Sequence, residues 1–244
     1  MAKLLITRRF WLNNFVQQAL CEIREILDFA SHHPVREMRK LALAETVAYI
    51  RENMPTAMGV YSKRQFLDLA IKRVRVEGHY VEFGVFNGAS IRFIASRIGD
   101  NRIIGFDSFE GLPEDWQGRD IEKGTFSRQG KLPRVPSNVE LQPGWFDKSL
   151  PRWLDGNPGP LAFVHIDSDL YSSAKTIFDL IAARLVPGTV IAFDEYFGYP
   201  QWQQHEFKAF QEFVERCDVA YEYLCYARTQ AAVRLTGGRQ CGRP

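Results

Sequence analysis

Residues 80–90 read YVEFGVFNGAS, and this stretch decides the fold of the chain. Apolar residues alternate with others up to Phe83, which is the pattern of a β-strand, and Gly84 and Gly88 then follow four residues apart. From Ala89 onward the apolar residues recur at helical spacing. The stretch therefore predicts a strand, a tight turn and a helix, the unit that opens many doubly wound sheets.

The turn after this strand is expected to lie against a ligand. Glycine at positions 84 and 88 lets a ligand approach the backbone closely, and the free amide groups of the next helix point at it. The spacing differs from the G-x-G-x-x-G pattern that clamps a pyrophosphate. Glu82, just before the turn, disfavours a phosphate and favours a ligand with a positive or neutral face, such as the amino acid end of S-adenosylmethionine.

A second acidic residue follows one helix and one strand later. Residues 102–106 predict a short buried strand, which brings Asp107 to its carboxyl end. An acid at this place in a doubly wound sheet is where a ribose diol is hydrogen-bonded. We therefore expect Glu82 and Asp107 to contact one cofactor that carries a ribose.

The composition bounds the class of protein. The 244 residues suffice for one α/β domain with additions. The formal charge of +2 gives no sign of nucleic acid binding, and no apolar run has the length of a membrane span. The four cysteines form no C-x-x-C pair, which indicates a reducing, cytoplasmic location without metal-thiolate chemistry. Polar residues interrupt the apolar stretch near the N-terminus, which argues against a signal peptide.

The chain is expected to contain three segments. They are a helical cap or oligomerisation segment at residues 1–75, the sheet domain at 76–236 and a disordered tail at 237–244. Residues 10–30 form one amphipathic stripe, which packs on its own domain, joins two subunits or lies on a membrane surface. Further helices are predicted at 35–51 and 61–74. We expect the cap to cover part of the mouth of the sheet and to support a homodimer or higher oligomer.

The rest of the chain alternates strands and helices, which predicts an α/β fold with a doubly wound, mostly parallel sheet of seven strands. The later strands are predicted at residues 138–141, 161–166, 189–193, 219–226 and 230–235, the last two as an antiparallel hairpin. The polar segment 108–138 is long for a connection in a compact domain and predicts a functional loop or lid. Trp145 and Phe146 follow the third strand and could stack on an adenine ring, with core packing as the alternative.

Acidic residues gather at the predicted carboxyl ends of the strands, where open α/β sheets bind ligands. They are Glu82, Asp107, Asp167, Asp169, Asp194 and Glu195. Many carboxylates at one edge raise the free energy unless a cation or hydrogen-bond donors compensate for them. Asp167, Asp194 and Glu195 could converge as oxygen ligands of Mg²⁺ or a similar ion, or could be helix caps instead. Such an ion would lower the pKa of a substrate hydroxyl, whose alkoxide could attack a methyl sulfonium.

Five motifs resemble those of the macrocin O-methyltransferase family. They are VEFGV at 81–85, FDSFEGLP at 106–113, GWF at 144–146, IDSDLY at 166–171 and FDEY at 193–196. The similarity spans about residues 55–235, and FDSFEGLP is its specific part. The resemblance implies the Rossmann-like fold of class I methyltransferases. It also implies a S-adenosylmethionine-dependent enzyme that methylates a hydroxyl of a sugar or glycosylated natural product.

The resemblance implies roles for individual residues. Contacts with S-adenosylmethionine are implied for Glu82, Gly84 and Gly88, with Asp107 on the ribose. Beside these, we expect the cofactor site to include Asn87, Ser90, Ser108, Trp145 and Phe146. Mg²⁺ or a similar divalent ion is expected on Asp167, Asp194 and Glu195, where the family more often has two aspartates at the last pair. Asp167 is also the expected catalytic proton acceptor, with Asp169 and His205 as alternatives, whereas His165 is expected in the core.

Two other functions are compatible with these motifs. One is a methyltransferase of the same fold that acts on a small phenolic or catechol-like acceptor, on which aromatic residues would stack. The other is a non-catalytic module that binds the cofactor and recruits a partner through its N-terminal helix. Acids at three strand ends argue against an inert module. Carboxylates gathered at one edge of the sheet raise the free energy of the folded protein, and an inert module would have no use for them. We expect a small-molecule or glycosyl acceptor. The loop at residues 108–138 and the N-terminal cap should determine which acceptor binds, and neither contains a motif that identifies it.

Overall fold

The computed structural model describes residue 22 and residues 33–238. All but one residue of the helix expected at 10–30, and residues 239–244 of the expected tail, lie outside the described residues. The chain divides into two compact units, Met1–Leu41 and Ala42–Pro244, and the sheet belongs to the second. Within the described ranges, no helix combines the length and apolarity that a membrane span requires.

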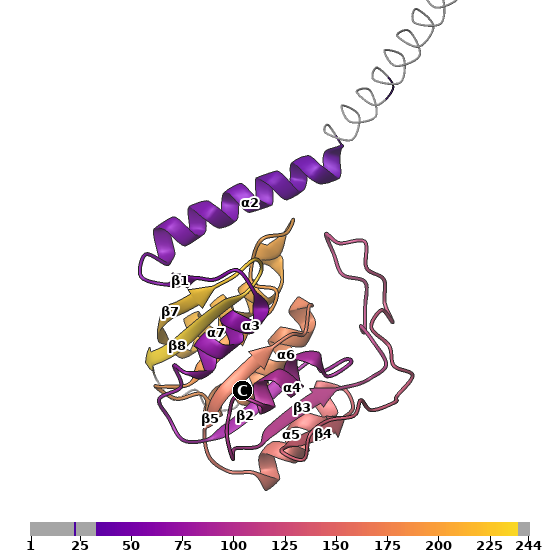
Figure 1. Ribbon diagram of the computed structural model, residues 1–244, viewed down its shortest axis with the longest axis vertical. Helices are drawn as coiled ribbons and strands as arrows, with labels where there is room; N and C mark the ends of the chain where they lie inside the picture. Colours follow the sequence, from indigo (N-terminus) through magenta and orange to yellow (C-terminus); the bar gives the residue numbers. More distant parts are fainter. Residues whose placement is uncertain (1–21, 23–32, 239–244) are drawn as a thin grey trace, which may run out of the picture. The chain divides into compact units, whose positions relative to one another are not determined.

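One mixed sheet forms the centre of the second unit (Figure 1). Among the described residues it has eight strands in the order β1-β7-β8-β6-β5-β2-β3-β4. The strands are β1 Met58–Gly59, β2 His79–Phe83, β3 Ile103–Asp107, β4 Val139–Pro143, β5 Leu161–Ile166, β6 Val190–Phe193, β7 Ala220–Tyr226 and β8 Ala231–Gly237. Only β8 runs antiparallel to its neighbours, β6 and β7. The predicted α/β fold with a mostly parallel sheet and a C-terminal hairpin is confirmed.

The sequence predicted seven strands, and the eighth is β1. Its two residues pair in parallel with Cys225 and Tyr226 of β7. Two residues are too few to show an alternating pattern, so sequence periodicity could not reveal this strand.

Helices alternate with the strands along the chain. They are α2 Pro34–Asn53, α3 Lys63–Ile71, α4 Ala89–Ala95, α5 Phe146–Gly156, α6 Tyr171–Ile181 and α7 Glu206–Cys217, with 3₁₀ turns η1 Ala182–Arg184 and η2 Trp202–Gln204. The helix predicted from residue 61 begins at Lys63, because Ser62 caps it. The Ser62 hydroxyl accepts a hydrogen bond of 3.2 Å from the amide of Gln65, which satisfies a free donor of the first turn.

Two separate apolar clusters show that helices cover both faces of the sheet. One cluster joins α3 and α4 to the sheet and includes Phe66 and Ile91. The other joins α5, α6 and α7 to the sheet and includes Leu150, Phe178 and Phe210. Strands covered on both faces are apolar throughout, and all six residues of β5 are buried.

The order of the strands reverses between β2 and β5. From β2 the chain proceeds outward through β3 and β4, whereas β5 and β6 lie on the other side of β2. Ligands of open α/β sheets bind outside the carboxyl ends of the strands at such a switch point. The fold therefore places the candidate site where β2, β3, β5 and β6 end.

Candidate active site

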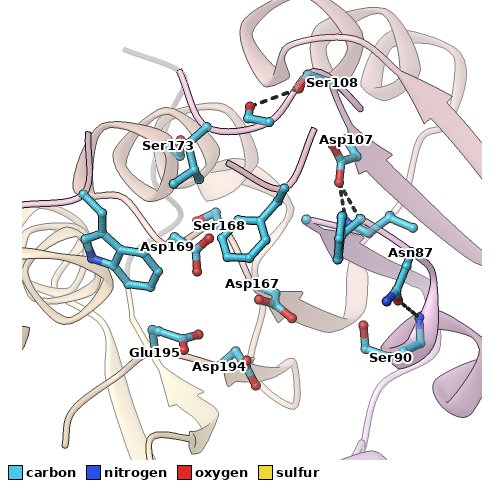
Figure 2. Close-up of a pocket in the computed structure, with 18 of the residues that line it drawn as sticks. Asn87, Ser90, Asp107, Ser108, Asp167, Ser168, Asp169, Ser173, Asp194 and Glu195 are labelled. Atoms are coloured by element: carbon cyan, nitrogen blue, oxygen red, sulfur yellow. Dashed lines mark hydrogen bonds between the residues drawn. The ribbon is translucent and has the colours of Figure 1, made fainter. Parts of the chain in front are cut away.

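A cavity of about 530 Å³ opens at the carboxyl ends of these four strands (Figure 2). Its volume is typical of a small-molecule site. Seven of the nine predicted cofactor-binding residues line it, namely Gly84, Asn87, Ser90, Asp107, Ser108, Trp145 and Phe146. Asp167, Asp169, Asp194 and Glu195 line the same cavity. The structure thus brings the expected cofactor residues and the expected catalytic acids to one space.

Glu82 lies behind the cavity and does not line it. Its side chain is fully buried, and Glu82 Oε1 accepts a hydrogen bond of 2.5 Å from the Ser90 hydroxyl. Glu82 Oε2 lies 3.7 Å from Nδ1 of His165, which is buried as expected of a core residue. Burial lowers the pKa of His165, but the carboxylate of Glu82 outweighs that effect, so the pKa is raised. Glu82 therefore does not contact the cavity itself, but it orients the hydroxyl of Ser90, which lines the cavity.

The two glycines of the turn have structural reasons of their own. Gly84 has φ of +93°, and a Cβ there would lie 1.7 Å from the carbonyl oxygen of Asp167. Gly88, the N-cap of α4, has φ of +81°, and a Cβ there would lie 2.8 Å from Nη1 of Arg92. Both glycines were predicted to make room for a ligand. The close approach of the ends of β2 and β5 requires Gly84 even without one.

Asp107 ties three backbone amides together at the end of β3. Its Oδ2 accepts hydrogen bonds from the amides of Val85 at 2.8 Å and Phe86 at 2.7 Å. Its Oδ1 accepts one of 2.6 Å from the amide of Phe109. A carboxylate can accept about four hydrogen bonds, so one acceptor position remains for a ligand. Figure 2 shows the two bonds that join Asp107 to the turn after β2.

The two predicted adenine-stacking residues lie on the cavity wall at the start of α5. Trp145 precedes the helix and keeps 39% of its surface exposed. The Phe146 ring packs edge-on against Phe83, with 5.6 Å between the ring centroids. Trp145 therefore has a free ring surface toward the cavity, whereas Phe146 also belongs to the core.

Lys63 joins two of the predicted metal ligands. Its Nζ lies 2.9 Å from Asp167 Oδ2 and 2.9 Å from Asp194 Oδ1. Burial raises the pKa of Asp167, Asp194 raises it further, and the result is about 6 in spite of Lys63. For Asp194, burial is outweighed by Lys63 and His165, so its pKa is lowered. Lys63 was not among the residues predicted for the site.

Three carboxylates form an open group beside this ion pair. Asp167, Asp169 and Glu195 each offer one oxygen within 4.8 Å of the others, and Figure 2 shows Asp169 and Glu195 facing each other. Burial and the neighbouring carboxylates raise the pKa of both Asp169 and Glu195 well above ordinary values. Glu195 Oε2 is buried without a hydrogen-bond partner among the described residues. This group is the part of the site in which negative charge is least compensated.

Glu206, the first residue of α7, holds the two acidic strand ends in place. Its Oε1 accepts hydrogen bonds from the amides of Ser168 at 3.0 Å and Asp169 at 3.1 Å. Its Oε2 accepts one of 3.3 Å from the amide of Glu195. Burial raises its pKa to about 8 even though these donors lower it. Glu206 was not predicted from the sequence, because a position at the start of a helix carries no signal of these contacts.

The segment between β3 and β4 covers the far end of the acidic group. Trp116 is buried there, and the Arg119 guanidinium contacts both the Trp116 and the Tyr199 ring, 4.2 Å from each centroid. Arg119 Nη2 is 3.9 Å from Glu195 Oε1 and lines the cavity. His205, an alternative proton acceptor, is buried with Nε2 2.9 Å from the Gln117 carbonyl oxygen, outside the cavity wall.

One family model matches the central part of the chain. Residues 81–196 match a family model described as a methyltransferase domain, which spans slightly less than half of the chain. No curated protein matches the chain. The matched domain supports an enzyme, as the sequence predicted.

Solved structures show the same fold. The calicheamicin methyltransferase CalS11 is 23% identical over 86% of this chain and 90% of that chain, with a TM-score of 0.56. The O-methyltransferase NovP is 21% identical over 72% and 80%, with a TM-score of 0.55. An apo structure of CalS11, described as a TDP-rhamnose 3'-O-methyltransferase of calicheamicin biosynthesis, is 22% identical over 86% and 92%, with a TM-score of 0.52. The chain has the Rossmann-like methyltransferase fold, and the finer resemblance to the macrocin O-methyltransferases stays a prediction.

Proposed function

We propose that this chain is a S-adenosylmethionine-dependent O-methyltransferase that acts, with a divalent ion, on a hydroxyl of a sugar or glycosylated acceptor. The observation that carries the proposal is the shared cavity, in which the acids after β5 and β6 face the cofactor turn after β2. The methyltransferase domain match supports methyl transfer. The fold shared with CalS11, described as acting on TDP-rhamnose, supports a sugar hydroxyl as the acceptor.

The cofactor would lie between the turn after β2 and Trp145. When bound, S-adenosylmethionine supplies a methyl group on a cationic sulfonium, and its transfer to oxygen leaves S-adenosylhomocysteine. Asp107 would use its remaining acceptor position for a ribose hydroxyl while it holds the amides of Val85 and Phe86. Ser90, held by Glu82, would face the amino acid end of the cofactor.

Asp167 would accept the proton of the acceptor hydroxyl. Its pKa of about 6 leaves it ionised at neutral pH but makes it a better base than an exposed aspartate. Asp167 would take this proton as the hydroxyl oxygen bonds to the methyl carbon, and the electron pair of the broken carbon–sulfur bond would stay on the sulfur of the bound cofactor. Asp169 lines the same wall and is the alternative base, whereas His205 lies outside the wall. The main contribution of the protein is then to place the hydroxyl in line with the methyl group.

The residues present fit a divalent ion. Carboxylate oxygens are the ligands that Mg²⁺ prefers, and Glu195 Oε2 is a buried oxygen without a hydrogen-bond partner among the described residues. A bound ion would lower the pKa of a coordinated hydroxyl. Asp167 and Glu195 belong both to the predicted ligand set and to the group of oxygens within 4.8 Å, in which Asp169 is the third member. Asp194 lies on the other side of Asp167, where it contacts Lys63.

Methyl transfer with labelled S-adenosylmethionine tests the proposal. The acceptor panel contains nucleotide sugars, neutral glycosides and a catechol, and the purified protein is analysed for bound S-adenosylhomocysteine and divalent metal. We expect transfer to a sugar acceptor that Asp167→Asn and EDTA abolish. Asp100→Asn, on the exposed turn after α4, is the matched control and should remain active.

Each other outcome contradicts a defined part of the proposal. Transfer to the catechol alone would assign a phenolic acceptor. Cofactor binding without transfer to any acceptor would favour a binding module. Full turnover in EDTA by a protein free of metal would contradict the proposed need for a divalent ion, while the proposed methyl transfer would stand. The possible homo-oligomer and the cytoplasmic location are further proposals that this experiment does not address.

A further inference from the structure

Lys63 contacts the acidic cluster, which consists of Asp167, Asp169, Asp194 and Glu195, although it does not come from a strand end. It is the first residue of α3, and the Ser62 cap fixes the start of that helix. Its ammonium contacts Asp167 and Asp194 at the same distance of 2.9 Å, so it bridges the ends of β5 and β6. Two carboxylates so close together repel each other unless a positive charge lies next to both, and the Lys63 ammonium supplies that charge.

The positive charge of Lys63 compensates the negative charges of Asp167 and Asp194. The ammonium of Lys63 forms an ion pair with each of the two carboxylates. Asp194 Oδ1 also accepts a hydrogen bond of 3.1 Å from Nε2 of Gln230. Asp167 Oδ2 and Asp194 Oδ1 are therefore already paired with donors. A divalent ion would have to displace both donors to bind there.

The cluster thus has two sides with Asp167 in common. On one side the other acid is Asp194, and the nearby His165 is fully buried next to Glu82. On the other side Asp169 and Glu195 line the cavity, and no cation contacts them more closely than Arg119 at 3.9 Å among the described residues. Only the second side is both open to the cavity and short of positive charge.

We propose that Lys63 is a resident cation of the site, which occupies the Asp167–Asp194 side of the cluster and excludes a divalent ion from it. The inference deepens the proposed function, because it confines the single proposed ion to Asp167, Asp169 and Glu195. Lys63 is a positioning residue in this account. It holds the Asp167 side chain, which follows β5, close to Asp194, which follows β6, and it does not contact the reacting hydroxyl.

Counting bound Mn²⁺ by the paramagnetic resonance of the free ion tests this inference on the full chain without an acceptor. We expect Lys63→Ala to bind one Mn²⁺ more than the wild type, because the vacated side then has two uncompensated carboxylates. Lys63→Arg retains the charge and should bind as many ions as the wild type. Lys72→Ala removes a lysine from the end of the same helix, where it pairs with Asp68, and should also match the wild type.

The counts separate this inference from the proposed metal dependence. A wild type that binds no Mn²⁺, together with a Lys63→Ala variant that binds one, would support Lys63 as the resident cation and contradict the proposed ion. Equal counts in the wild type and Lys63→Ala, whether one or none, would overturn the inference.

Amine labelling of the wild type gives a second test that does not depend on the folding of a variant. Acetic anhydride should modify Lys63 at least tenfold more slowly than the exposed Lys72, as read by peptide mass spectrometry, and Mn²⁺ should not change the ratio. Labelling of Lys63 that rises to the rate of Lys72 on addition of Mn²⁺ would mean that the ion displaces the lysine, which contradicts the inference.

Discussion

The carboxylate of Glu206 accepts a hydrogen bond from the backbone amide of Ser168, with 3.0 Å between oxygen and nitrogen. The same side chain accepts hydrogen bonds from the backbone amides of Asp169 and Glu195. One residue of α7 therefore fixes the loops after β5 and β6. These loops carry every acid of the proposed catalytic group. The geometry of the site therefore depends on a residue that does not line the cavity.

Replacing Glu206 by alanine should destabilise the protein strongly. The change leaves one buried and two partly buried amides without their acceptor, and a buried unsatisfied group costs about 1 to 3 kcal/mol. We expect the free energy of unfolding in urea to fall by about 3 kcal/mol or more. Glu206→Gln keeps an amide oxygen for one loop and should lose about 1 kcal/mol. Equal losses for the two variants would show that the hydrogen bonds do not carry the effect.

The pH dependence of stability should report the burial of Glu206. Its pKa is raised to about 8 in the folded protein, so from about pH 5 to 8 the folded state retains a proton that the unfolded state has released. The free energy of unfolding should fall as pH rises through this window, by about 1.4 kcal/mol per pH unit for this group. Measurement in EDTA excludes bound metal. A Glu206→Gln variant with the same slope as the wild type would contradict the assignment.

Removal of the Asp107 carboxylate should weaken cofactor binding. Asp107→Ala releases the amides of Val85 and Phe86 and removes the proposed ribose contact, so the Kd for S-adenosylhomocysteine should rise at least tenfold by calorimetry. Asp107→Asn retains one carbonyl oxygen and should have an intermediate Kd. Glu110→Ala changes an exposed acid of the same motif outside the cavity wall and serves as the control. An unchanged Kd in Asp107→Ala would remove the ribose assignment.

A methyl group at Gly84 should not be tolerated. The added Cβ would lie 1.7 Å from the carbonyl oxygen of Asp167, so β2 and β5 would have to separate where the site is built. We expect Gly84→Ala to lose more than about 3 kcal/mol in thermal unfolding or to fail to fold. Gly99→Ala also has positive φ but no heavy atom within 4 Å, and should lose only about 1 to 2 kcal/mol. Similar losses at both positions would point to backbone strain alone.

The sequence predicted the parts of the site that follow from strand ends. Asp107, Asp167 and Asp194 each come directly after an apolar run, and parallel strands bring such residues to one edge. The two-residue strand β1 was missed because it shows no periodicity. The strand count was therefore one too low, although the fold class was correct.

The residues that hold the site together could not be found in this way. Lys63 contacts Asp167 across 104 positions of sequence, and Glu206 contacts Ser168 across 38. Each stands at the start of a helix, where a charged residue is usually solvated, so no local pattern distinguishes it. Their partners become known only when α3 and α7 are placed against the sheet.

Calorimetric titration of the wild-type chain with S-adenosylhomocysteine tests the central claim most directly, because it needs neither acceptor nor metal. The account predicts one molecule bound per chain with a Kd in the micromolar range, equivalent to about −8 kcal/mol. It also predicts that NAD⁺ does not compete. Absence of binding by S-adenosylhomocysteine at millimolar concentration, by a protein shown to be folded, would contradict the account.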